Sequence, residues 1–249
     1  MTRLQWDRSS DQVYEFGVSK GVLYPQDSDG VAWLGLTNVK SDTFSEPGTS
    51  YYIDGRKYEY VPGFKEFIGE IRAYTYPKAF NSYMGYMPIV QALYAGDSLS
   101  PYQTFGLCYR TEIADSGSGG RIKGYKLHII YNAIATPQTQ DRNTVEGHTE
   151  PDEFIWSITT KPLELYNVGP VSYFVVDSTE TTSATMAVLE EVLYGTNITE
   201  PRLPSINELV SILSNPIGSY GEWQTRMFNE GNDTYGKIDD HYDEYGDIS

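Results

Sequence analysis

The chain has 249 residues and a formal net charge of -16, from 18 basic and 34 acidic residues. A surface that grips nucleic acid needs clustered Lys and Arg to displace counterions from phosphates, so this charge argues against one. A single cysteine excludes an intrachain disulfide and a thiolate metal cluster, and it favours a reducing compartment. The 39% of hydrophobic residues can supply a folded core, and the 22 tyrosines leave a surplus for surfaces or interfaces.

The first residues lack the apolar run of a signal peptide, and no stretch approaches the ~20 apolar residues that span a membrane. We therefore expect a protein that is made in the cytosol and is not inserted into a membrane. The length is compatible with one large β domain, and our starting expectation is one domain plus an appendage.

The first clear signals are those of a β-hairpin. Residues 51–53 and 57–61 read as strands on either side of Asp54 and Gly55. Asp-Gly is a strong hairpin signal because glycine tolerates positive φ. Residues 66–76 follow as a strand with period-2 alternation, and its apolar face holds Phe67, Ile71 and Ala73.

Longer strands are expected in the middle of the chain. Residues 105–112 alternate up to a Gly/Ser-rich turn, and residues 124–135 form a long strand that Pro137 stops. One face of the long strand is expected to carry Tyr125, Leu127, Ile129, Tyr131 and Ala133. A further strand at 154–158 and a run at 171–176, apolar enough to be buried on both faces, complete the set.

Two helices are expected late in the chain. Residues 182–194 have helical spacing of apolar side chains and end at Gly195, a natural left-handed cap. The second helix covers residues 205–213 and begins with a capping box formed by Ser205 and Glu208. The sequence therefore predicts a mainly β fold, an antiparallel sandwich or barrel with one or two flanking helices, over residues 1–213.

Two segments do not fit a simple core. Residues 78–104 form a long loop between strands, and loops this apolar rarely hang in water. We expect it to pack on a neighbouring subunit, with coverage of its own core as the alternative. The candidate contacts are Phe80, Tyr83, Met84, Tyr86, Met87, Ile89, Val90, Leu93 and Tyr94.

The other segment is the C-terminal arm, residues 214–249. It holds eight acidic and two basic residues, so it contributes 2 - 8 = -6 to the charge, and aromatic residues are interspersed. An acidic, aromatic arm needs a surface to lie on, and a neighbouring subunit is the economical choice. Its expected contacts are Tyr220, Trp223, Phe228, Tyr235, Tyr242 and Tyr245.

A search for catalytic and metal-binding patterns assigns no catalytic, cofactor-binding or metal-ligating residue. His128, His148 and His241 are scattered and match no metalloenzyme spacing. Cys108 is beside Arg110, but a small buried hydrophobe is the better interpretation because no His companion is placed by sequence. Neighbouring acids are expected by abundance alone in a chain with 34 of them.

Nine segments together resemble the major tail protein, or tail tube protein, of siphoviruses that infect actinobacteria. The match covers roughly residues 3–213, and it is the order and spacing of the segments that is specific. They are WDRSSDQVYEFGVSKGVLYP from Trp6, WLGLTNV from Trp33, YYIDGRKY from Tyr51, AYTYP ending at Pro77, FGLCYRT from Phe105, GYKLHIIYNAIATP from Gly124, FIWSITTKP from Phe154, LEEVLYGT from Leu189 and PRLPSINELVSIL from Pro201.

The resemblance implies a tail-tube β-sandwich, six copies per ring, and rings stacked around a channel for double-stranded DNA. It also implies assembly in the bacterial cytoplasm, a place in the virion tail, and tape-measure, tail terminator and baseplate proteins as partners. Residues 214–249 lie outside it. On this expectation Glu66, Glu70 and Glu112, which alternate with apolar residues on strands, are candidates for an acidic channel lining that DNA does not stick to.

Two other classes of function stay open on the sequence alone. The first is a β-sandwich carbohydrate hydrolase or lyase, which needs a cleft with two carboxyl groups about 5 to 9.5 Å apart. The second is a carbohydrate-binding or adhesin domain, which needs aromatic side chains along an exposed groove of the monomer. Electron microscopy of the purified protein separates these classes, because only a tube subunit forms rings or filaments.

Overall fold

The structure of this chain is a computed structural model that describes residues 12–45, 47–61, 63, 65–96, 103–116, 119–140, 151–165 and 169–214. The proposed contacts of the C-terminal arm, from Tyr220 to Tyr245, lie outside the described residues. The elements in chain order are β1 (Val13–Tyr24), β2 (Val31–Ala32), β3 (Leu36–Ser45), β4 (Thr49–Ile53), β5 (Arg56–Val61), β6 (Lys65–Ala73), the 3-10 helix η1 (Lys78–Met84), β7 (Tyr86–Val90), β8 (Leu93–Gly96), β9 (Phe105–Asp115), β10 (Arg121–Pro137), β11 (Phe154–Thr160), β12 (Leu163–Leu165), β13 (Gly169–Val171), β14 (Tyr173–Asp177), α1 (Ser183–Tyr194) and α2 (Ile206–Ser214).

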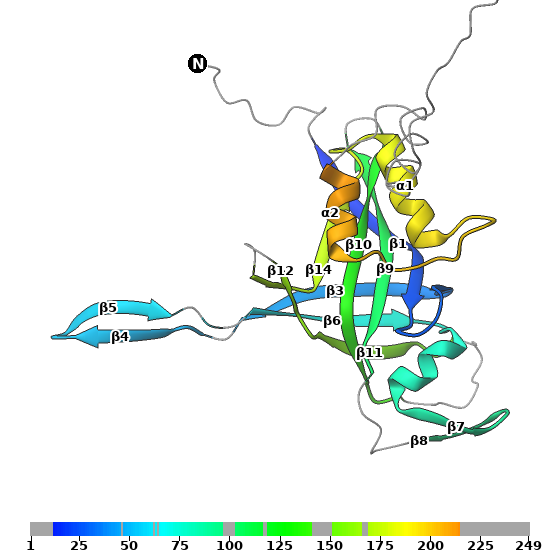
Figure 1. The fold of residues 1–249 in the computed structure, drawn as a ribbon, viewed down its shortest axis with the longest axis horizontal. Coiled ribbons are helices and arrows are strands. Elements are labelled where there is room, and N and C mark those ends of the chain that lie inside the picture. The colour runs from blue at the N-terminus through cyan, green and yellow to red at the C-terminus, as the bar shows by residue number, and fades with distance from the viewer. Residues whose placement is uncertain are drawn as a thin grey trace, which may run out of the picture.

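The main sheet is antiparallel and has the strand order β2-β1-β9-β10-β11-β6-β3, with β14 also paired to β10. The predicted class, mainly antiparallel β with two flanking helices, is confirmed. Strand β10 divides the sheet, because residues 126–130 in its middle pair with β14 and its last five residues pair with β11. In Figure 1, β1, β9, β10 and β14 run up the view, and β3, β6 and β11 cross them as a second layer.

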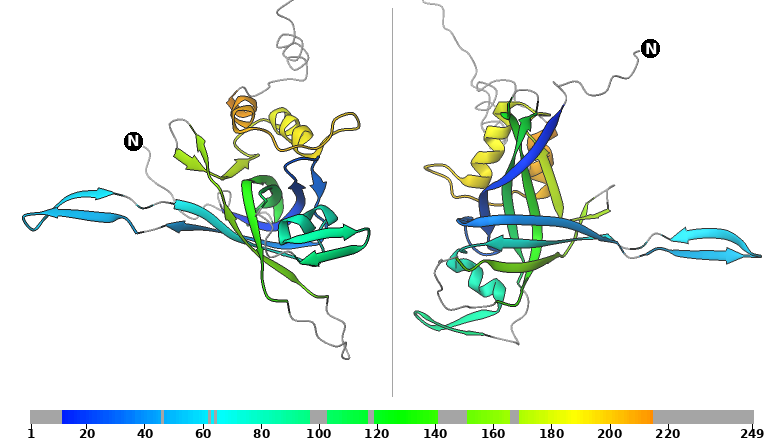
Figure 2. Two further views of the ribbon diagram at one scale, coloured as in Figure 1. Left: turned by 60° about the horizontal axis from the view of Figure 1, so that its bottom comes forward. Right: turned by 180° about the vertical axis from the view of Figure 1, so that it is seen from behind.

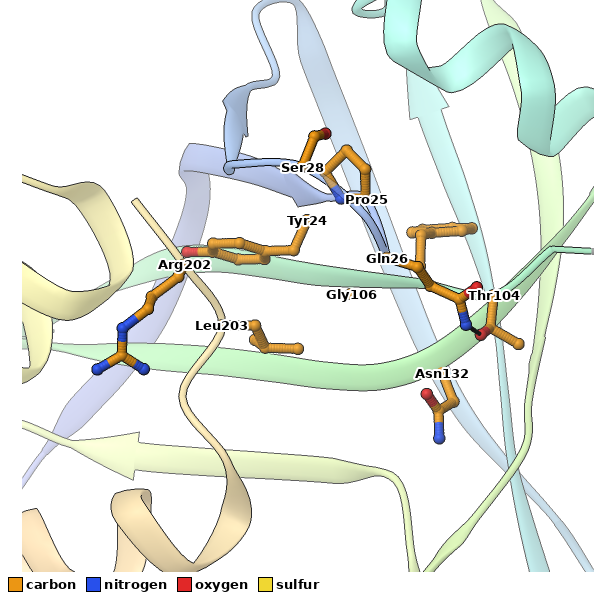
Figure 3. Close-up of a pocket in the computed structure, with 10 residues that line it drawn as sticks. Tyr24, Pro25, Gln26, Ser28, Thr104, Gly106, Asn132, Arg202 and Leu203 are labelled. Carbon is orange, nitrogen blue, oxygen red and sulfur yellow. Dashed lines mark hydrogen bonds between the residues drawn. The ribbon is translucent and has the colours of Figure 1, made fainter. Parts of the chain in front are cut away.

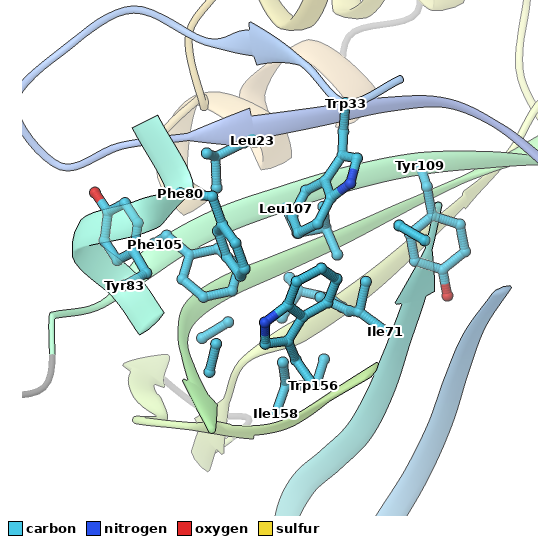
Figure 4. Packing of buried hydrophobic residues seen from close by; sticks show 14 of the residues in the cluster. Leu23, Trp33, Ile71, Phe80, Tyr83, Phe105, Leu107, Tyr109, Trp156 and Ile158 are labelled. Atoms are coloured by element: carbon cyan, nitrogen blue, oxygen red, sulfur yellow. The ribbon is translucent and has the colours of Figure 1, made fainter. Parts of the chain in front are cut away.

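The larger core cluster fills the space between these two layers and is dominated by aromatic rings (Figure 4). Phe80 packs its ring against Trp33 and Trp156, at centroid distances of 4.6 Å and 5.2 Å. Such edge and tilted contacts add to the gain from removing the rings from water. The layers are thereby held together by side chains from β6, β9, β10, β11 and η1.

A second core cluster lies on the other face of the β1-β9-β10-β14 layer, under α1 and α2. It contains Cys108 and Leu127 from the strands and Met186, Leu189 and Leu209 from the helices. The molecule therefore has three layers, with helices, a first sheet and a second sheet, and β9 is buried on both faces. Figure 2 shows the same order of layers from two further directions.

The predicted common face of the long strand is correct only as far as Tyr131. Tyr125, Leu127, Ile129 and Tyr131 all lie on the helix side, but Ala133 lies in the core between the two sheets. The cause is a register irregularity between Ile130 and Ala133, where Asn132 has a positive φ of 49°. A bulge adds one residue and so reverses the alternation of side chains beyond it.

The expectation that residues 171–176 form a strand buried on both faces is wrong. Val171 ends β13, and β14 then runs along the margin of the sheet, hydrogen-bonded to β10 only among the described strands. Val176 is buried under the helices, whereas the side chain of Val175 is 45% exposed. One face of this apolar run therefore meets solvent in the isolated chain.

Both predicted helices are present, with caps that differ in detail from the expected ones. The side chain of Thr182 accepts a hydrogen bond from the Thr185 amide at the start of α1. Gly195 has φ 75° and ψ 175°, so its φ is positive but its conformation is not the left-handed helical one that we expected. Ser205 Oγ accepts from the Glu208 amide at 3.2 Å, while the Glu208 carboxylate binds the Arg202 guanidinium and leaves the capping box half formed.

The hairpin predicted at Asp54 and Gly55 is confirmed as β4 and β5. Asp54 has φ 50° and Gly55 has φ 73°, as the tight hairpin turns with two positive φ angles require. This hairpin is rooted in the neighbouring strands β3 and β6 and extends well away from the layered body (Figure 1; Figure 2). The second hairpin, β7 and β8, extends from η1 at the lower margin of Figure 1.

Candidate functional site

The β4–β5 hairpin presents apolar side chains to solvent on both of its faces. Tyr52 and Tyr58 are 65% and 72% exposed. Side chains directly opposite each other share a face, so the register of Tyr52 with Lys57 and of Tyr51 with Glu59 places a tyrosine on each side. An isolated two-stranded hairpin is marginally stable in water, so this one is a candidate to bind another surface.

The β7–β8 hairpin is a second apolar projection and carries no charge between residues 86 and 96. Six of the residues that we expected at a contact between subunits are exposed on it. These residues are Tyr86, Met87, Ile89, Val90, Leu93 and Tyr94. Pro88 lacks an N–H group and so cannot donate to an added strand along β7, which favours docking through side-chain faces.

The first part of the 78–104 segment covers the chain's own core instead. Phe80 and Tyr83 are buried among the residues between the two sheets, and Met84 Sδ accepts a hydrogen bond from Trp156 Nε1 at 2.9 Å. Phe80 and Tyr83 are therefore not available for a contact between subunits, and our expectation is corrected for these two, whereas Met84 is only partly buried. Helix η1 buries Phe80 and Tyr83 because its tight turn aligns them on one side.

The three acidic residues proposed for a channel lining do not share a surface. Glu66 and Glu70 lie on β6 opposite its core-facing residues, on the outer face of the second sheet. Glu112 lies on the helix side of β9, where Arg110 Nη2 binds its carboxylate at 2.8 Å and the Arg110 guanidinium stacks 3.8 Å from the Tyr125 ring. Because both faces of β9 are covered, Glu112 cannot line the same wall as the other two.

The outer face of the second sheet is mostly polar, and we call it the polar wall. It carries Lys40, Glu66, Glu70, Arg72 and Ser157, with Ile68 and Ile155 between them. Lys40 on β3 is opposite Glu70 on β6, and Ser157 on β11 is opposite Glu70 on its other side. Arg72 Nε donates to Glu70 Oε1 at 2.6 Å, and Arg72 Nη1 lies 3.5 Å from Glu153 Oε2. The two carboxylates therefore share one guanidinium across an open hollow of about 360 Å³, and their charge is partly neutralised there.

A polar network that the sequence did not reveal joins four strands at one end of the sandwich. Tyr173 OH donates to His128 Nδ1 at 2.6 Å, and His128 Nε2 lies 2.8 Å from Thr111 Oγ1 and 3.2 Å from Glu15. Thr111 donates to the same Glu15 carboxylate at 2.6 Å, and Lys126 binds its other oxygen. Because Thr111 donates onward to Glu15, its oxygen is free to accept from His128 Nε2.

Burial and charge set the ionisation of this network. Burial lowers the pKa of His128, and the negative charge of Glu15 opposes that shift. Burial alone would raise the pKa of Glu15, but hydrogen bonds from Lys126 and Thr111 outweigh it and lower that pKa. The imidazole is therefore neutral near pH 7, stacked 4.5 Å from the Tyr109 ring, and it holds β1, β9, β10 and β14 together.

A hollow of about 260 Å³ opens where β1 ends and β9 begins (Figure 3). Its polar lining includes Gln26, Thr104 and Asn132, and Figure 3 shows the Arg202 guanidinium turned away from them. Arg202 is already bound to Glu208, and Tyr24 OH donates to the Leu193 carbonyl at 2.7 Å. The hollow thus brings together amide and hydroxyl groups and no acid, histidine or cysteine.

Cys108 is a buried core residue, as the sequence indicated. It is fully buried beneath α1, and this burial raises the pKa of its thiol to about 12. A thiol of this kind is protonated at neutral pH and is a poor nucleophile.

Within the described ranges, no three His, Cys, Asp or Glu side chains gather as a metal site would need. In the same residues, no helix has the length and hydropathy to cross a membrane.

Comparison with known proteins finds no matching family model. No curated protein matches either. Among solved structures, the chain is similar to one in the sheath-tube complex of the PVC extracellular contractile injection system, with 9% identity, a TM-score of 0.33, and coverage of 64% of this chain and 88% of that chain. It is also similar to the tube terminating cap of the anti-feeding prophage (AFP), with 10% identity, a TM-score of 0.35, and coverage of 70% and 100%.

A third similar structure is the sheath/tube terminator of the PVC system, with 9% identity, a TM-score of 0.32, and coverage of 66% and 97%. TM-scores of this size do not establish a common fold.

Proposed function

We propose that this chain is a structural subunit of a virus tail, which assembles with its own copies into rings of six that stack as a tube for DNA. The observation that carries the proposal is the pair of hairpins that hold apolar side chains in solvent. A monomer seldom exposes contiguous apolar surface without a binding role. The sequence segments that resemble tail tube proteins indicate that this role is assembly with further copies. A second copy is the partner that is always present.

The open margins of the sheet also favour association. Strand β3 pairs with β6 only and β14 pairs with β10 only, so each has one side without a strand partner among the described residues. Unpaired strand edges are sites where further strands add, and a ring of copies would cover them. A closed ring would therefore cover the unpaired strand edges that the isolated sheet leaves exposed.

The polar wall on β3, β6 and β11 is the surface that we propose faces the channel. It carries Glu66 and Glu70 beside Lys40 and Arg72, so acidic and basic groups are mixed on it. With a net charge of -16 per chain, DNA gains little by binding and is able to pass. Glu112 has no part in this wall. Tape-measure, terminator and baseplate proteins would meet the ends of the tube, in the virion, after assembly in the host cytoplasm.

Electron microscopy of the purified protein at rising salt concentration tests this function. Salt screens the repulsion between chains of like charge, so the wild type should form rings or filaments as salt increases. Substitution of Tyr52 and Tyr58 by serine should leave the protein monomeric with an unchanged melting temperature. Ile198, which is 94% exposed on the loop after α1, provides the matched control, and Ile198→Ser should assemble normally.

Two results would contradict the proposal. The first is a wild type that stays monomeric at every salt and protein concentration. The second is a monomer that binds glycans through Tyr52 and Tyr58, which would support the carbohydrate-binding alternative. Turnover of a polysaccharide that depends on Glu70 and Glu153 would instead support the two-carboxylate enzyme.

A further inference from the structure

A hollow of about 500 Å³ lies along the margin of the first sheet, between β14, the turn that follows it, and the end of α2. Val175, Val176 and Leu213 form its apolar part, and Asp177 and Glu180 form an acidic rim. We call these five residues and the threonines at 179–182 the β14 groove. Three consecutive β14 residues line the groove and no β10 residue does, so the groove runs along the side of β14 that β10 leaves open.

The two acids of the rim differ in their local partners. Asp177 Oδ1 accepts from the amide and the hydroxyl of Thr179, at 2.8 Å and 2.6 Å, so it stabilises the turn. Glu180 is exposed, and no cation among the described residues pairs with it. A positive group from another molecule would find its counter-charge at Glu180.

Charge decides between the segments of this chain that could occupy the groove. Residues 215–249 continue directly from α2, but their eight acids and two bases are repelled by an acidic rim. The β7–β8 hairpin has no charge to offer between residues 86 and 96. The tip of the β4–β5 hairpin, residues 53–58, carries two bases, Arg56 and Lys57, against one acid in the turn, Asp54. Its net charge is therefore positive, and the exposed apolar side chains of Ile53 and Tyr58 lie next to Arg56.

We propose that the tip of the β4–β5 hairpin of one copy docks in the β14 groove of a second copy. Arg56 lies against Glu180, and Ile53 and Tyr58, which share its face of the hairpin, cover Val175 and Leu213. The contact joins two copies, because in one copy the hairpin projects far from β14, which lies beside α2 (Figure 1; Figure 2). This inference rests on the proposed self-assembly and names the surface that receives the hairpin.

A charge-swap experiment on assembly tests the contact. Arg56→Glu and Glu180→Arg should each raise the protein concentration needed for assembly by roughly tenfold, since repulsion replaces attraction. The double variant Arg56→Glu with Glu180→Arg should return to within about threefold of the wild type. A mixture of the two single variants should assemble better than either one alone, because Glu at 56 of one copy then meets Arg at 180 of the other.

Glu200→Arg is the matched control, because Glu200 is an exposed acid outside the groove and the change of charge is the same. It should assemble at least as well as the wild type, since it reduces the overall negative charge. Normal assembly of Arg56→Glu or of Glu180→Arg would overturn the inference, and so would a double variant that stays defective. A wild type that never assembles would instead refute the proposed function, so the two failures are distinguishable.

Cross-linking identifies the occupant directly. Cys108 is fully buried, so cysteines introduced as Arg56→Cys and Glu180→Cys are the accessible thiols of their chains. Under mild oxidation, a mixture of these two variants should form disulfide-linked dimers that neither variant forms by itself. No mixed dimer, or a bond from Glu180→Cys to a cysteine placed within residues 215–249, would overturn the inference.

Discussion

Replacing Phe80 with alanine tests how the segment 78–104 divides between the core and the surface. Phe80 is 0% exposed, and its ring packs against Trp33, Trp156 and Phe105 at centroid distances of 4.6, 5.2 and 5.3 Å. Truncation of a fully buried phenylalanine to alanine lowers the free energy of unfolding by about 3–5 kcal/mol. The loss has two parts, the transfer free energy of the removed ring and the cost of the cavity that remains. That loss is a large part of the roughly 5–15 kcal/mol by which a domain is stable.

Urea unfolding followed by tryptophan fluorescence measures this loss, since two of the neighbours of Phe80 are tryptophans. With a denaturant slope of about 2–3 kcal/mol per M, the midpoint should fall by roughly 1–2.5 M. The matched variant is Ile89→Ser on the β7–β8 hairpin, where the side chain is 57% exposed. It should change the free energy of unfolding by no more than about 0.5 kcal/mol and should weaken assembly.

An unchanged midpoint for Phe80→Ala combined with lost assembly would refute this division, because Phe80 would then act at a contact between copies. A large destabilisation of the monomer by Ile89→Ser would also refute the division of segment 78–104 into a core part and a surface part. In that case the β7–β8 hairpin would be part of the core of its own chain.

Three further predictions follow from the ionisable groups and the helix cap. Because burial lowers the pKa of His128, the unfolded chain takes up its proton at higher pH than the folded chain does. The stability that His128 confers is therefore complete above pH 6.5 and is lost as the pH falls below that value. The urea midpoint should therefore decline less steeply from pH 7.5 to pH 5 in His128→Asn than in the wild type. Equal slopes for the two proteins would contradict this. Cys108, whose pKa is raised to about 12, should resist alkylation at pH 8 in the folded protein and react once it is denatured, and rapid labelling of the folded protein would contradict its burial. Thr182→Ala should cost about 1 kcal/mol of unfolding free energy through the lost cap of α1, and no measurable change would show that the cap is unimportant.

Features with a local physical cause could be predicted from the sequence. The β4–β5 turn depends on two adjacent residues that tolerate positive φ, and Asp54 and Gly55 supply them. The start of α2 depends on one hydroxyl three residues before an amide, and Ser205 provides it. The residues that determine such a turn or helix start lie within a few positions of each other in the sequence. These features can therefore be predicted without knowledge of the tertiary fold.

Features that depend on distant partners could not be predicted. The reversal of faces at Asn132 follows from a bulge in the pairing of β10 with β9, and alternation alone gives no sign of it. Glu112 alternates with apolar residues as Glu70 does, yet a helix from a later part of the chain covers its face. The network around His128 draws its members from β1, β9, β10 and β14, so no sequence spacing could have indicated it.

The sharing of β10 between the two sheets gives the molecule a continuous path for mechanical load. A pull on the β4–β5 hairpin acts lengthwise on β3 and β6, and the hydrogen bonds to β11 pass the force to the last residues of β10. The rest of β10 is fastened to β9 and β14 beneath the helices, so the force spreads through the whole sheet. Rupture then requires many hydrogen bonds to shear at once instead of opening one after another.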